Sequence, residues 1–453
     1  MQLGAKMKLE NLFIEKLHGI YNYDVDFNED ITFLYGSNGC GKTTILNIVT
    51  SIVTGKIYEL FFYDFKIIKL KYSNNDNVDV IEIKRKQDDK NRLKIIFEGR
   101  NETISKLDNL NFQSSRRKIL LKEYFHENNI LKDISRLFNY VYLPLSRSAY
   151  VDPIRSSRKN FWIEEEEIEE ELYVTKDASL TRVQELIVNK ILTINNEVNR
   201  LNNNFRDKIL KTSINIYSEK KNFSDMINEI ENSNEEKILE IQESYLNIMT
   251  NLKLINEREI EKYNNFFSSY IKKYEQITDE NDGKVKHFPI DLVLQYSEIS
   301  KIRKVVELAQ QMEKDKKQAE KPLELFCSTI NSFLSRPGDI DSKNIIIETI
   351  GQPGVYFKIP NNQNKLSVQK LSSGEKQLII FFANLIFGVN DRKNGIFIVD
   401  EPELSLHLTW QKLFIEQTLK INNNIQLIFA THSPEIVGRH RDKMYKLEKV
   451  LGE

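Results

Sequence analysis

The chain has 453 residues, of which 65 are Lys or Arg and 66 are Asp or Glu, so its formal net charge is −1. This length exceeds one ordinary core and predicts two or three domains. The balanced charge excludes a general attraction to nucleic acid, so DNA is a possible partner only through a local basic patch. The two cysteines, Cys40 and Cys327, exclude a disulfide framework and a CxxC zinc site, and they favour a reducing cytoplasm.

The longest apolar run, Leu378–Val389, contains Asn384. It is shorter than the about 20 residues that a membrane helix needs. The run therefore predicts a buried helix, and we expect no membrane partner.

The first hundred residues have the pattern of strands and one helix. Ile31–Tyr35 is an apolar β run that leads into a glycine-rich loop, and a helix is predicted at Thr44–Thr54. Turn residues separate the β-rich segments that follow, which predicts an antiparallel sheet beside the core. The other predicted strands of this part are Leu9–Ile14, Asp24–Phe27, Phe65–Tyr72, Val78–Arg85 and Leu93–Phe97.

The glycine-rich loop reads GSNGCGKT. Its glycines let the backbone approach phosphate groups, and the N–H groups at the start of the following helix offer positive partial charge. Lys42 is placed to reach the β- and γ-phosphates, the Thr43 hydroxyl to ligate Mg²⁺, and Thr44 to add an α-phosphate contact. Such loops also occur without a ligand, but the preceding strand supplies the context that phosphate binding requires. The expected binding residues are Gly36, Ser37, Asn38, Gly39, Cys40, Gly41, Lys42, Thr43 and Thr44.

Between about Ser157 and Lys321 apolar residues recur at spacings of three and four, almost without Gly or Pro, which predicts helices. Heptad rhythms cover Ile187–Phe205 and Ile238–Ile255, and the phase break before Ile260 is typical of a coiled-coil stutter. We expect a helical hairpin or small bundle with arms of about 45 Å. The apolar stripes favour packing as a lever or dimer surface over direct contact with DNA.

After Pro322 the pattern returns to β and then alternates with helices. The N- and C-terminal thirds are therefore expected to fold together as one discontinuous head. The predicted strands are Asn344–Ile350, Val355–Ile359, Ile396–Val399 and Ile425–Ala430, and the predicted helices are Gly374–Phe387 and Leu406–Leu419.

A second candidate anion site is LSSGE at Leu371–Glu375. Ser372, Ser373 and Gly374 at a helix start can bind an anion, and Glu375 follows in the first turn. The alternative is an ordinary loop and N-cap, which Glu375 would also favour. Since the glycine-rich loop already accounts for the phosphates of one subunit, a second site implies a second copy of the chain.

Two acids and a histidine follow later strands. Asp400 ends the apolar strand of IFIVDEPE, where its carboxylate can orient the shell of Mg²⁺, and Glu401 is placed to polarise a water as general base. His432 in FATHS can contact a γ-phosphate or orient the water. Such residues are often structural, but the phosphate loop upstream favours a catalytic role for Glu401. Thr431, Ser433 and Pro434 around His432 favour a functional switch there.

Together these blocks resemble the ABC ATPase superfamily, with GSNGCGKT as Walker A, LSSGEKQ as signature, IFIVDE as Walker B and THS as switch histidine. The resemblance implies an α/β fold: an ABC-type P-loop NTPase head with an antiparallel β subdomain, interrupted by a long α-helical, coiled-coil-like insertion. The implied parts are residues 7–150, 151–335 and 336–453. The resemblance also implies that two heads sandwich two ATP molecules, with the signature of one subunit on the nucleotide that Lys42 of the other holds.

Within the superfamily, DEPELSLHLTWQ and ATHSPEIV are similar to the soluble branch of SMC-like repair ATPases, overcoming-lysogenization-defect nucleases and anti-phage ATPases of the Septu and PARIS types. By this resemblance, Glu403 and Ser405 lie in a D-loop near the dimer seam, and His407 helps to shape it.

The sequence also departs from that branch. It lacks a zinc hook, and only 21 residues follow His432, so we do not expect the lysogenization-defect nuclease domain there. The usual Q-loop glutamine is absent from the expected junction at Tyr142–Leu145, and Arg147, which follows Ser146, is either a site residue or an ordinary surface residue. His18 lies either near the nucleotide or in a structural role.

These inferences predict a cytoplasmic ATPase that hydrolyses ATP to ADP and phosphate and regulates a bacterial anti-phage system. No nuclease motif is visible, so the effector is expected to be a separate protein, such as an HNH or topoisomerase-primase-type nuclease. The alternative is a DNA-repair or chromosome-associated clamp that grips DNA through Arg116–Lys118, Arg155–Lys159 or Lys301–Lys304. A transporter subunit is least compatible, because the helical insertion is foreign to it.

Overall fold

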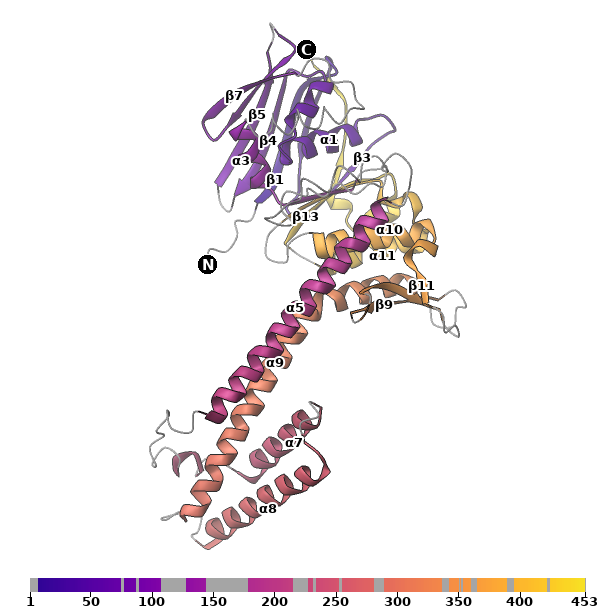
Figure 1. Ribbon diagram of the computed structural model, residues 1–453. Coiled ribbons are helices and arrows are strands. Elements are labelled where there is room, and N and C mark those ends of the chain that lie inside the picture. Colours follow the sequence, from indigo (N-terminus) through magenta and orange to yellow (C-terminus); the bar gives the residue numbers. More distant parts are fainter. Residues whose placement is uncertain are drawn as a thin grey trace. The chain divides into compact units, whose positions relative to one another are not determined.

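The computed structural model divides into two compact units, which are described separately (Figure 1). The head comprises Met1–Ile191 and Pro322–Glu453, and the helical unit comprises Leu192–Lys321. The predicted limits at residues 150 and 335 stay a prediction, because segments beside both lie outside the described residues. The structure describes residues 7–74, 77–86, 89–106, 128–143, 178–214, 227–230, 234–251, 255–280, 289–335, 342–349, 351, 353–359, 365–388, 395–421 and 424–452.

A five-stranded sheet with parallel neighbours forms the centre of the head, in the order β14-β3-β13-β12-β8. Its three inner strands are nearly continuous apolar runs, as expected for strands covered on both faces. N-terminal and C-terminal segments therefore alternate within one sheet, which confirms the expected discontinuous α/β fold. The strands are β3 (Ile31–Tyr35), β8 (Tyr140–Leu143), β12 (Gly395–Asp400), β13 (Ile425–Ala430) and β14 (Met444–Lys446).

A seven-stranded antiparallel sheet, in the order β15-β2-β1-β4-β5-β6-β7, forms the subdomain beside it. β7 was not predicted; it follows a turn in which Glu98 and Gly99 both have positive φ, of 49° and 72°. A hairpin turn of this kind usually shows Asn or Asp at the first position, so the sequence signal was weak. The strands are β1 (Met7–Leu17), β2 (Tyr21–Asp26), β4 (Ile67–Asn74), β5 (Asn77–Arg85), β6 (Arg92–Phe97), β7 (Arg100–Ser105) and β15 (Val450–Leu451).

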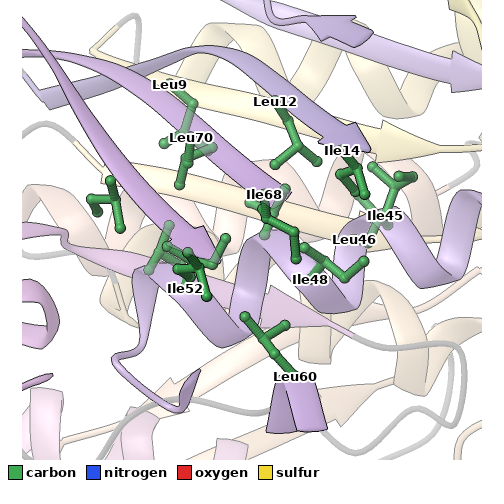
Figure 2. Close-up of a cluster of buried hydrophobic side chains, with 14 of the residues drawn as sticks. Leu9, Leu12, Ile14, Ile45, Leu46, Ile48, Ile52, Leu60, Ile68 and Leu70 are labelled. Carbon is green, nitrogen blue, oxygen red and sulfur yellow. The ribbon is translucent and has the colours of Figure 1, made fainter. Parts of the chain in front are cut away.

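Helix α1 (Lys42–Val53) packs between these two sheets. Figure 2 shows Leu9, Leu12 and Ile14 of β1 and Ile68 of β4 facing the helix, whose Ile45, Leu46, Ile48 and Ile52 are buried. Burying a side chain of this size contributes about 1.5–3 kcal/mol, so the cluster fixes the start of α1 firmly. The phosphate loop that precedes α1 is thereby held on a rigid support.

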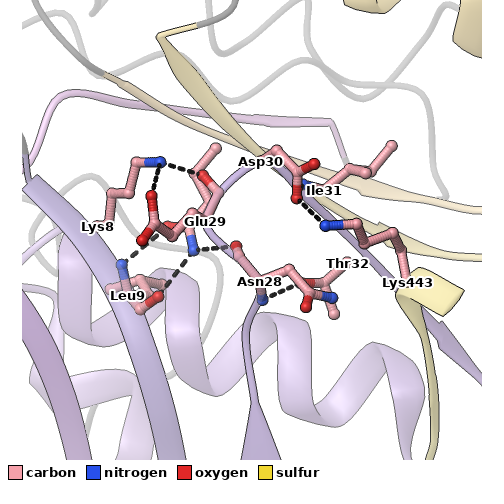
Figure 3. A network of polar contacts seen from close by, with 9 residues as sticks. Lys8, Leu9, Asn28, Glu29, Asp30, Ile31, Thr32 and Lys443 are labelled. Atoms are coloured by element: carbon pink, nitrogen blue, oxygen red, sulfur yellow. Dashed lines mark hydrogen bonds and ion pairs between the residues drawn. The ribbon is translucent and has the colours of Figure 1, made fainter.

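Gln426 joins the two sheets by polar contacts. Its side chain is fully buried on β13, and its oxygen accepts the backbone N–H of Leu9 at 2.8 Å. Its amide nitrogen donates to the carbonyls of Leu9 and Asn28, at 2.7 and 2.8 Å. Figure 3 shows the surrounding network, in which Lys8 contacts Glu29 and Lys443 contacts Asp30. A polar residue inside an apolar strand thus completes backbone hydrogen bonds of β1, which belongs to the other sheet.

The other face of the parallel sheet is covered by aromatic side chains of α10 (Ser373–Ala383) and α11 (Leu408–Ile421). Phe381 lies 5.2 Å from Phe397 of β12, and Phe414 lies 6.3 Å from Phe429 of β13, between ring centroids. α10 continues as a π-helix, Asn384–Gly388, so the predicted buried helix is confirmed with an irregular last turn. No helix among the described residues is both long and apolar enough to span a bilayer.

The remaining elements of the head are short. α3 (Asn129–Leu137) precedes β8, and α12 (Pro434–Val437) follows β13. A three-stranded antiparallel sheet precedes the signature, in the order β11-β10-β9. Its strands are β9 (Asn344–Glu348), β10 (Gly354–Lys358) and β11 (Lys365–Ser367). The 3-10 turns within the described residues are Ile57–Phe62, Val368–Lys370, Pro402–Ser405 and Arg441–Lys443.

The unit Leu192–Lys321 is helical in its described residues. α7 (Glu235–Asn251), α8 (Glu257–Glu280) and the first part of α9 (Ile290–Leu334) share an apolar core that includes Phe267, Tyr270 and Tyr296. The predicted stutter is wrong, because Ile255 and Asn256 are not helical and the phase break is the gap between α7 and α8. The apolar stripes therefore pack against one another rather than along one continuous rod.

Two long helices cross the limits between the units. α5 (Ala178–Ile214) buries Ile187, Ile191, Ile194 and Phe205 of the predicted heptad stripe. α9 runs through Pro322, where the sequence predicted a return to strands. Proline removes one helical hydrogen bond. The buried side chains of the following turns, Leu323, Phe326, Ile330 and Phe333, explain why the helix continues.

Candidate functional site

The phosphate loop lies between β3 and α1 and has a backbone that only glycine accommodates. Gly41 caps α1 with φ of 106°, and a Cβ there would lie 2.9 Å from the Tyr23 hydroxyl. That hydroxyl donates to the carbonyl of Cys40 at 2.9 Å. Burial, together with Cys40, raises the pKa of Tyr23 to about 12, so the donor stays protonated. Sequence reasoning missed Tyr23, which fixes the loop from β2.

Lys42 is buried against the loop that it belongs to. Its ammonium donates to the carbonyl of Gly36 at 3.3 Å and lies 4.0 Å from Sγ of Cys40. Ser37, Asn38 and Gly39 are exposed, and Thr44 is half-buried. The loop thus presents exposed residues around a buried cation, which suits a phosphate chain that approaches from solvent.

Asp400 and Thr43 meet where β12 ends beside the start of α1. The Thr43 hydroxyl donates to Oδ2 of Asp400 at 2.8 Å, although 357 positions separate them. Asp400 is only 4% exposed, and its Oδ1 is buried without a hydrogen-bond partner among the described residues. Burial raises the pKa of Asp400; the Thr43 hydrogen bond opposes this shift, and the charge of Glu401 adds to it. A hydroxyl beside an unsatisfied carboxylate oxygen fits Mg²⁺, which prefers oxygen ligands.

Glu401 and His432 come together from neighbouring strands. Glu401 has a left-handed backbone, with φ of 48°, and its N–H donates to the carbonyl of Ala430 at 2.8 Å. Its Oε1 lies 3.7 Å from Nε2 of His432. Non-glycine residues adopt such a conformation at a cost of about 1–3 kcal/mol, and it is common at functional sites. The conformation turns the Glu401 side chain toward His432.

Glu403 has a larger role than its assignment to the D-loop suggested. Its Oε1 accepts the backbone N–H groups of His432 and Ser433, at 2.6 and 3.2 Å. The Ser433 hydroxyl donates to Oε1 of Gln411 at 2.7 Å, and Gln411 donates to the carbonyl of Leu406 at 2.8 Å. The segment after Walker B and the switch histidine loop are therefore linked through side chains of this one head.

The signature begins α10 with a complete capping box. Glu375 Oε2 accepts the backbone N–H of Ser372 at 2.7 Å, and the Ser372 hydroxyl accepts the N–H of Glu375 at 3.4 Å. Glu375 Oε1 accepts the ammonium of Lys343 at 2.6 Å. Ser372 and Ser373 are exposed, whereas Gly374 is buried and a Cβ there would lie 2.4 Å from the Ser405 carbonyl. Only glycine fits this contact.

The structure therefore brings Lys42, Thr43, Asp400, Glu401 and His432 to one end of the parallel sheet. The described hydrogen bonds of the Ser372 and Glu375 side chains go to each other's residues and to Lys343, and none reaches the phosphate loop. The expected nucleotide contacts of the signature, including one by Glu375, stay predictions.

Three further assignments have different outcomes. His407 Nδ1 lies 3.0 Å from the Thr409 hydroxyl at the start of α11. His18 lies in an exposed turn after β1, where its backbone N–H donates to Asp64, so its predicted place near a nucleotide stays untested. Ser146 and Arg147 lie outside the described residues, as does the rest of the expected Q-loop beyond Leu143.

The comparison with protein families gives a match over residues 31–438, to the family described as "AAA domain, putative AbiEii toxin, Type IV TA system". The chain belongs to this family. Its motifs and strand order make it an ABC-type P-loop ATPase head with an antiparallel β subdomain and a helical insertion.

Two curated relatives are themselves named as ATPases. "Retron Ec83 probable ATPase" of Escherichia coli is 34% identical over 87 residues, which are 17% of this chain and 16% of the relative. "Retron Vc95 probable ATPase" of Vibrio cholerae serotype O1 biovar El Tor is 27% identical over 205 residues, which are 41% of this chain and 38% of the relative. The matches thus span less than half of each relative.

Solved structures with similar chains include heads of Smc proteins. The Pyrococcus furiosus Smc head with an extended coiled coil, bound to the C-terminal domain of ScpA, aligns over 98% of this chain and 96% of that chain, with 12% identity and a TM-score of 0.41. The Pyrococcus yayanosii Smc head with a coiled coil and joint aligns over 95% and 93%, with 14% identity and a TM-score of 0.39.

Proposed function

We propose that the chain is a cytoplasmic ATPase that binds ATP with Mg²⁺ and hydrolyses it to ADP and phosphate. The observation that carries the proposal is the buried Oδ1 of Asp400, which has no hydrogen-bond partner among the described residues. The other oxygen of the same carboxylate, Oδ2, accepts the Thr43 hydroxyl. Thr43 and Asp400 would hold the metal, whose charge offsets that of the phosphates when it is bound. A buried carboxylate oxygen without a partner is costly, and a bound cation would remove that cost.

Each nearby residue has a role that follows from its place. Lys42 would exchange its contact with the Gly36 carbonyl for the β- and γ-phosphates. Glu401 would accept a proton from the attacking water, and His432, 3.7 Å away, would orient that water or contact the γ-phosphate. Glu403 holds the His432 and Ser433 amides and so positions the switch loop.

We propose further that two copies close around the nucleotide. The signature offers the exposed Ser372 and Ser373 at a helix start that its own phosphate loop does not use. Leu404 and Leu408, on either side of His407, are 52% and 58% exposed. Exposed apolar side chains beside an anion site favour a protein surface that becomes covered. Light scattering with and without ATP tests this proposal: the molar mass should double with ATP, and a constant mass during turnover would contradict it.

The wider role that we propose is control of a separate effector in bacterial anti-phage defence. The names of both relatives associate such ATPases with retrons, and the family description names a toxin of a toxin–antitoxin system. The effector would be a nuclease of the HNH or topoisomerase-primase type. Expression of the chain alone and together with its neighbouring genes tests the role. Phage protection should require both, and toxicity from this chain alone would contradict a separate effector.

The DNA clamp stays the alternative. Of its three candidate basic clusters, only Lys301–Lys304 lies among the described residues. There Lys301 pairs with Glu298 at 2.7 Å, and Arg303 donates to the Tyr296 hydroxyl at 3.1 Å. These partners disfavour a phosphate-binding role. Tight DNA binding that weakens steeply with salt would restore the clamp hypothesis.

A further inference from the structure

Lys343 lies outside every motif of the sequence, between the end of α9 and β9. Its backbone N–H donates to the carbonyl of Leu334, the last residue of α9, at 3.1 Å. Its ammonium lies 2.6 Å from Oε1 of Glu375, and the two side chains are 21% and 9% exposed. The pair therefore connects the end of α9 to the first turn of the signature helix, within the head.

The charge of Glu375 depends on this pair. Burial alone would raise the pKa of Glu375, but the hydrogen bonds from Lys343 and from the Ser372 backbone hold that pKa below its ordinary value. The ionised carboxylate can accept two hydrogen bonds at once, one on each oxygen. Loss of the ammonium would leave a buried carboxylate with one remaining partner, which is strongly unfavourable.

The position of the signature follows from the same carboxylate. Glu375 Oε2 holds the N–H of Ser372, and Ser372 and Ser373 are the exposed residues that face solvent at the helix start. α9 also contacts the other side of this region, because the indole N–H of Trp410 donates to the carbonyl of Phe333 at 3.1 Å. Trp410 in turn lies against Gly374, because a Cβ at that position would lie 3.3 Å from the indole ring.

We propose that Lys343 is a positioning residue for the signature. It keeps Glu375 ionised inside the capping box and so holds Ser372 and Ser373 where the nucleotide of a second copy meets them. This inference rests on the proposed ATP-dependent pairing. Lys343 then affects the site that holds the partner copy's nucleotide. The phosphate loop of its own copy is unaffected.

The test compares Lys343→Met with Lys343→Arg, which keeps the cation, and with the control Lys443→Met. Lys443 forms an ion pair with Asp30 at 3.0 Å (Figure 3). This pair is more exposed, with side chains 28% and 53% exposed, and no described hydrogen bond joins it to the signature. Lys343→Met should weaken ATP-dependent pairing and lower turnover by about tenfold, the effect expected for one charged hydrogen bond. Its affinity for a fluorescent ATP analogue should stay unchanged, and Lys343→Arg and Lys443→Met should pair normally.

Mixing experiments separate positioning from a general loss of stability. Lys343→Met mixed with Lys42→Ala should regain turnover, because one composite site then combines an intact phosphate loop with an intact signature. The same variant mixed with Ser372→Arg should show no turnover above the residual activity of Lys343→Met alone. No recovery with Lys42→Ala, or pairing of Lys343→Met as tight as wild type, would overturn the inference. Absence of pairing in the wild type would instead refute the proposed function.

A second variant keeps the test decisive if Lys343→Met does not fold. The double variant Lys343→Met with Glu375→Gln replaces the buried charge by an amide, and glutamine also completes a capping box. This double variant should fold and pair more tightly than Lys343→Met alone. A folded double variant that does not pair would contradict the role assigned to the capping box.

Discussion

The phosphate loop and the signature are both turns at the start of a helix for which we propose anion binding, and they are stabilised in opposite ways. In the phosphate loop, Gly41 has a left-handed backbone, and beside the loop Glu401 has one too. Asp400, which contacts Thr43, buries an oxygen without a hydrogen-bond partner among the described residues. At the signature, both carboxylate oxygens of Glu375 have partners within the head. On the proposed function, the first region would gain stability when a ligand binds, whereas the second has its hydrogen bonds beforehand and would act as a rigid surface.

This contrast separates what each region contributes to the proposed reaction. The costly contacts of the phosphate loop favour tight binding of a charged ligand, because binding removes their cost. The signature would gain no internal bond from a nucleotide, so on the proposed function it would act through its position. Variants of the two regions should therefore fail in different steps.

Lys42→Ala should have the largest effect. Nucleotide affinity should fall by about a hundredfold or more, because the charge-assisted hydrogen bonds to the phosphates are lost. The signature of this variant should stay intact, since its capping box does not involve Lys42. Equilibrium binding of a fluorescent ATP analogue measures the effect, and near-normal affinity would remove Lys42 from the site.

Glu401→Gln should separate binding from chemistry. Turnover should fall by about a hundredfold or more, which is the usual range for loss of a general base. ATP should stay bound and the paired state should persist, because glutamine keeps the size of the side chain. Phosphate release and light scattering measure both effects. Normal turnover would exclude Glu401 as the base.

Ser372→Arg should break pairing and leave the phosphate loop unaffected. The bulky cation occupies an exposed position of the signature, and loss of the cap costs the helix about 1 kcal/mol. Nucleotide affinity should equal that of the wild type, while ATP no longer doubles the molar mass. A dimer that forms as readily as in the wild type would contradict the proposed seam.

The smallest effect concerns stability: without ligand, Asp400→Asn should stabilise the protein, although it removes a proposed Mg²⁺ ligand. The raised pKa of Asp400 means that the fold disfavours its charged form, so the cost appears as the pH rises above the ordinary value of 3.8. Without nucleotide or Mg²⁺, the variant should gain about 1 kcal/mol at pH 7.5 and less at pH 4.5. Thermal unfolding in EDTA measures the difference. A destabilised variant at pH 7.5 would contradict the cost assigned to the buried charge of Asp400.

Much of the central fold could be predicted from the sequence. β3 and β13 were predicted with their observed limits, and β12 nearly so, because inner parallel strands are continuous apolar runs. Thr43 and Asp400, which were each predicted to ligate Mg²⁺, lie within hydrogen-bond distance of each other. Local sequence patterns were sufficient to predict structure where the burial of a residue follows from the apolar run that contains it.

Other features depend on distant contacts that no local pattern contains. Gln426 looks like a polar interruption of a strand, yet it bonds Leu9, 417 positions away. Lys343 and Glu375 are 32 positions apart, and neither spacing nor composition indicates their ion pair. At Pro322 the local rule predicted a helix end, but packing of the following apolar residues outweighed it.

The central claim is that each active site needs residues from two copies of the chain. Mixing Lys42→Ala with Ser372→Arg tests it most directly, because each variant damages a different half of the composite site. Each variant alone should be inactive, and the mixture should regain turnover through the one complete site of a mixed dimer. An inactive mixture in which native mass spectrometry detects the mixed dimer would contradict the claim, as would full activity of Ser372→Arg alone.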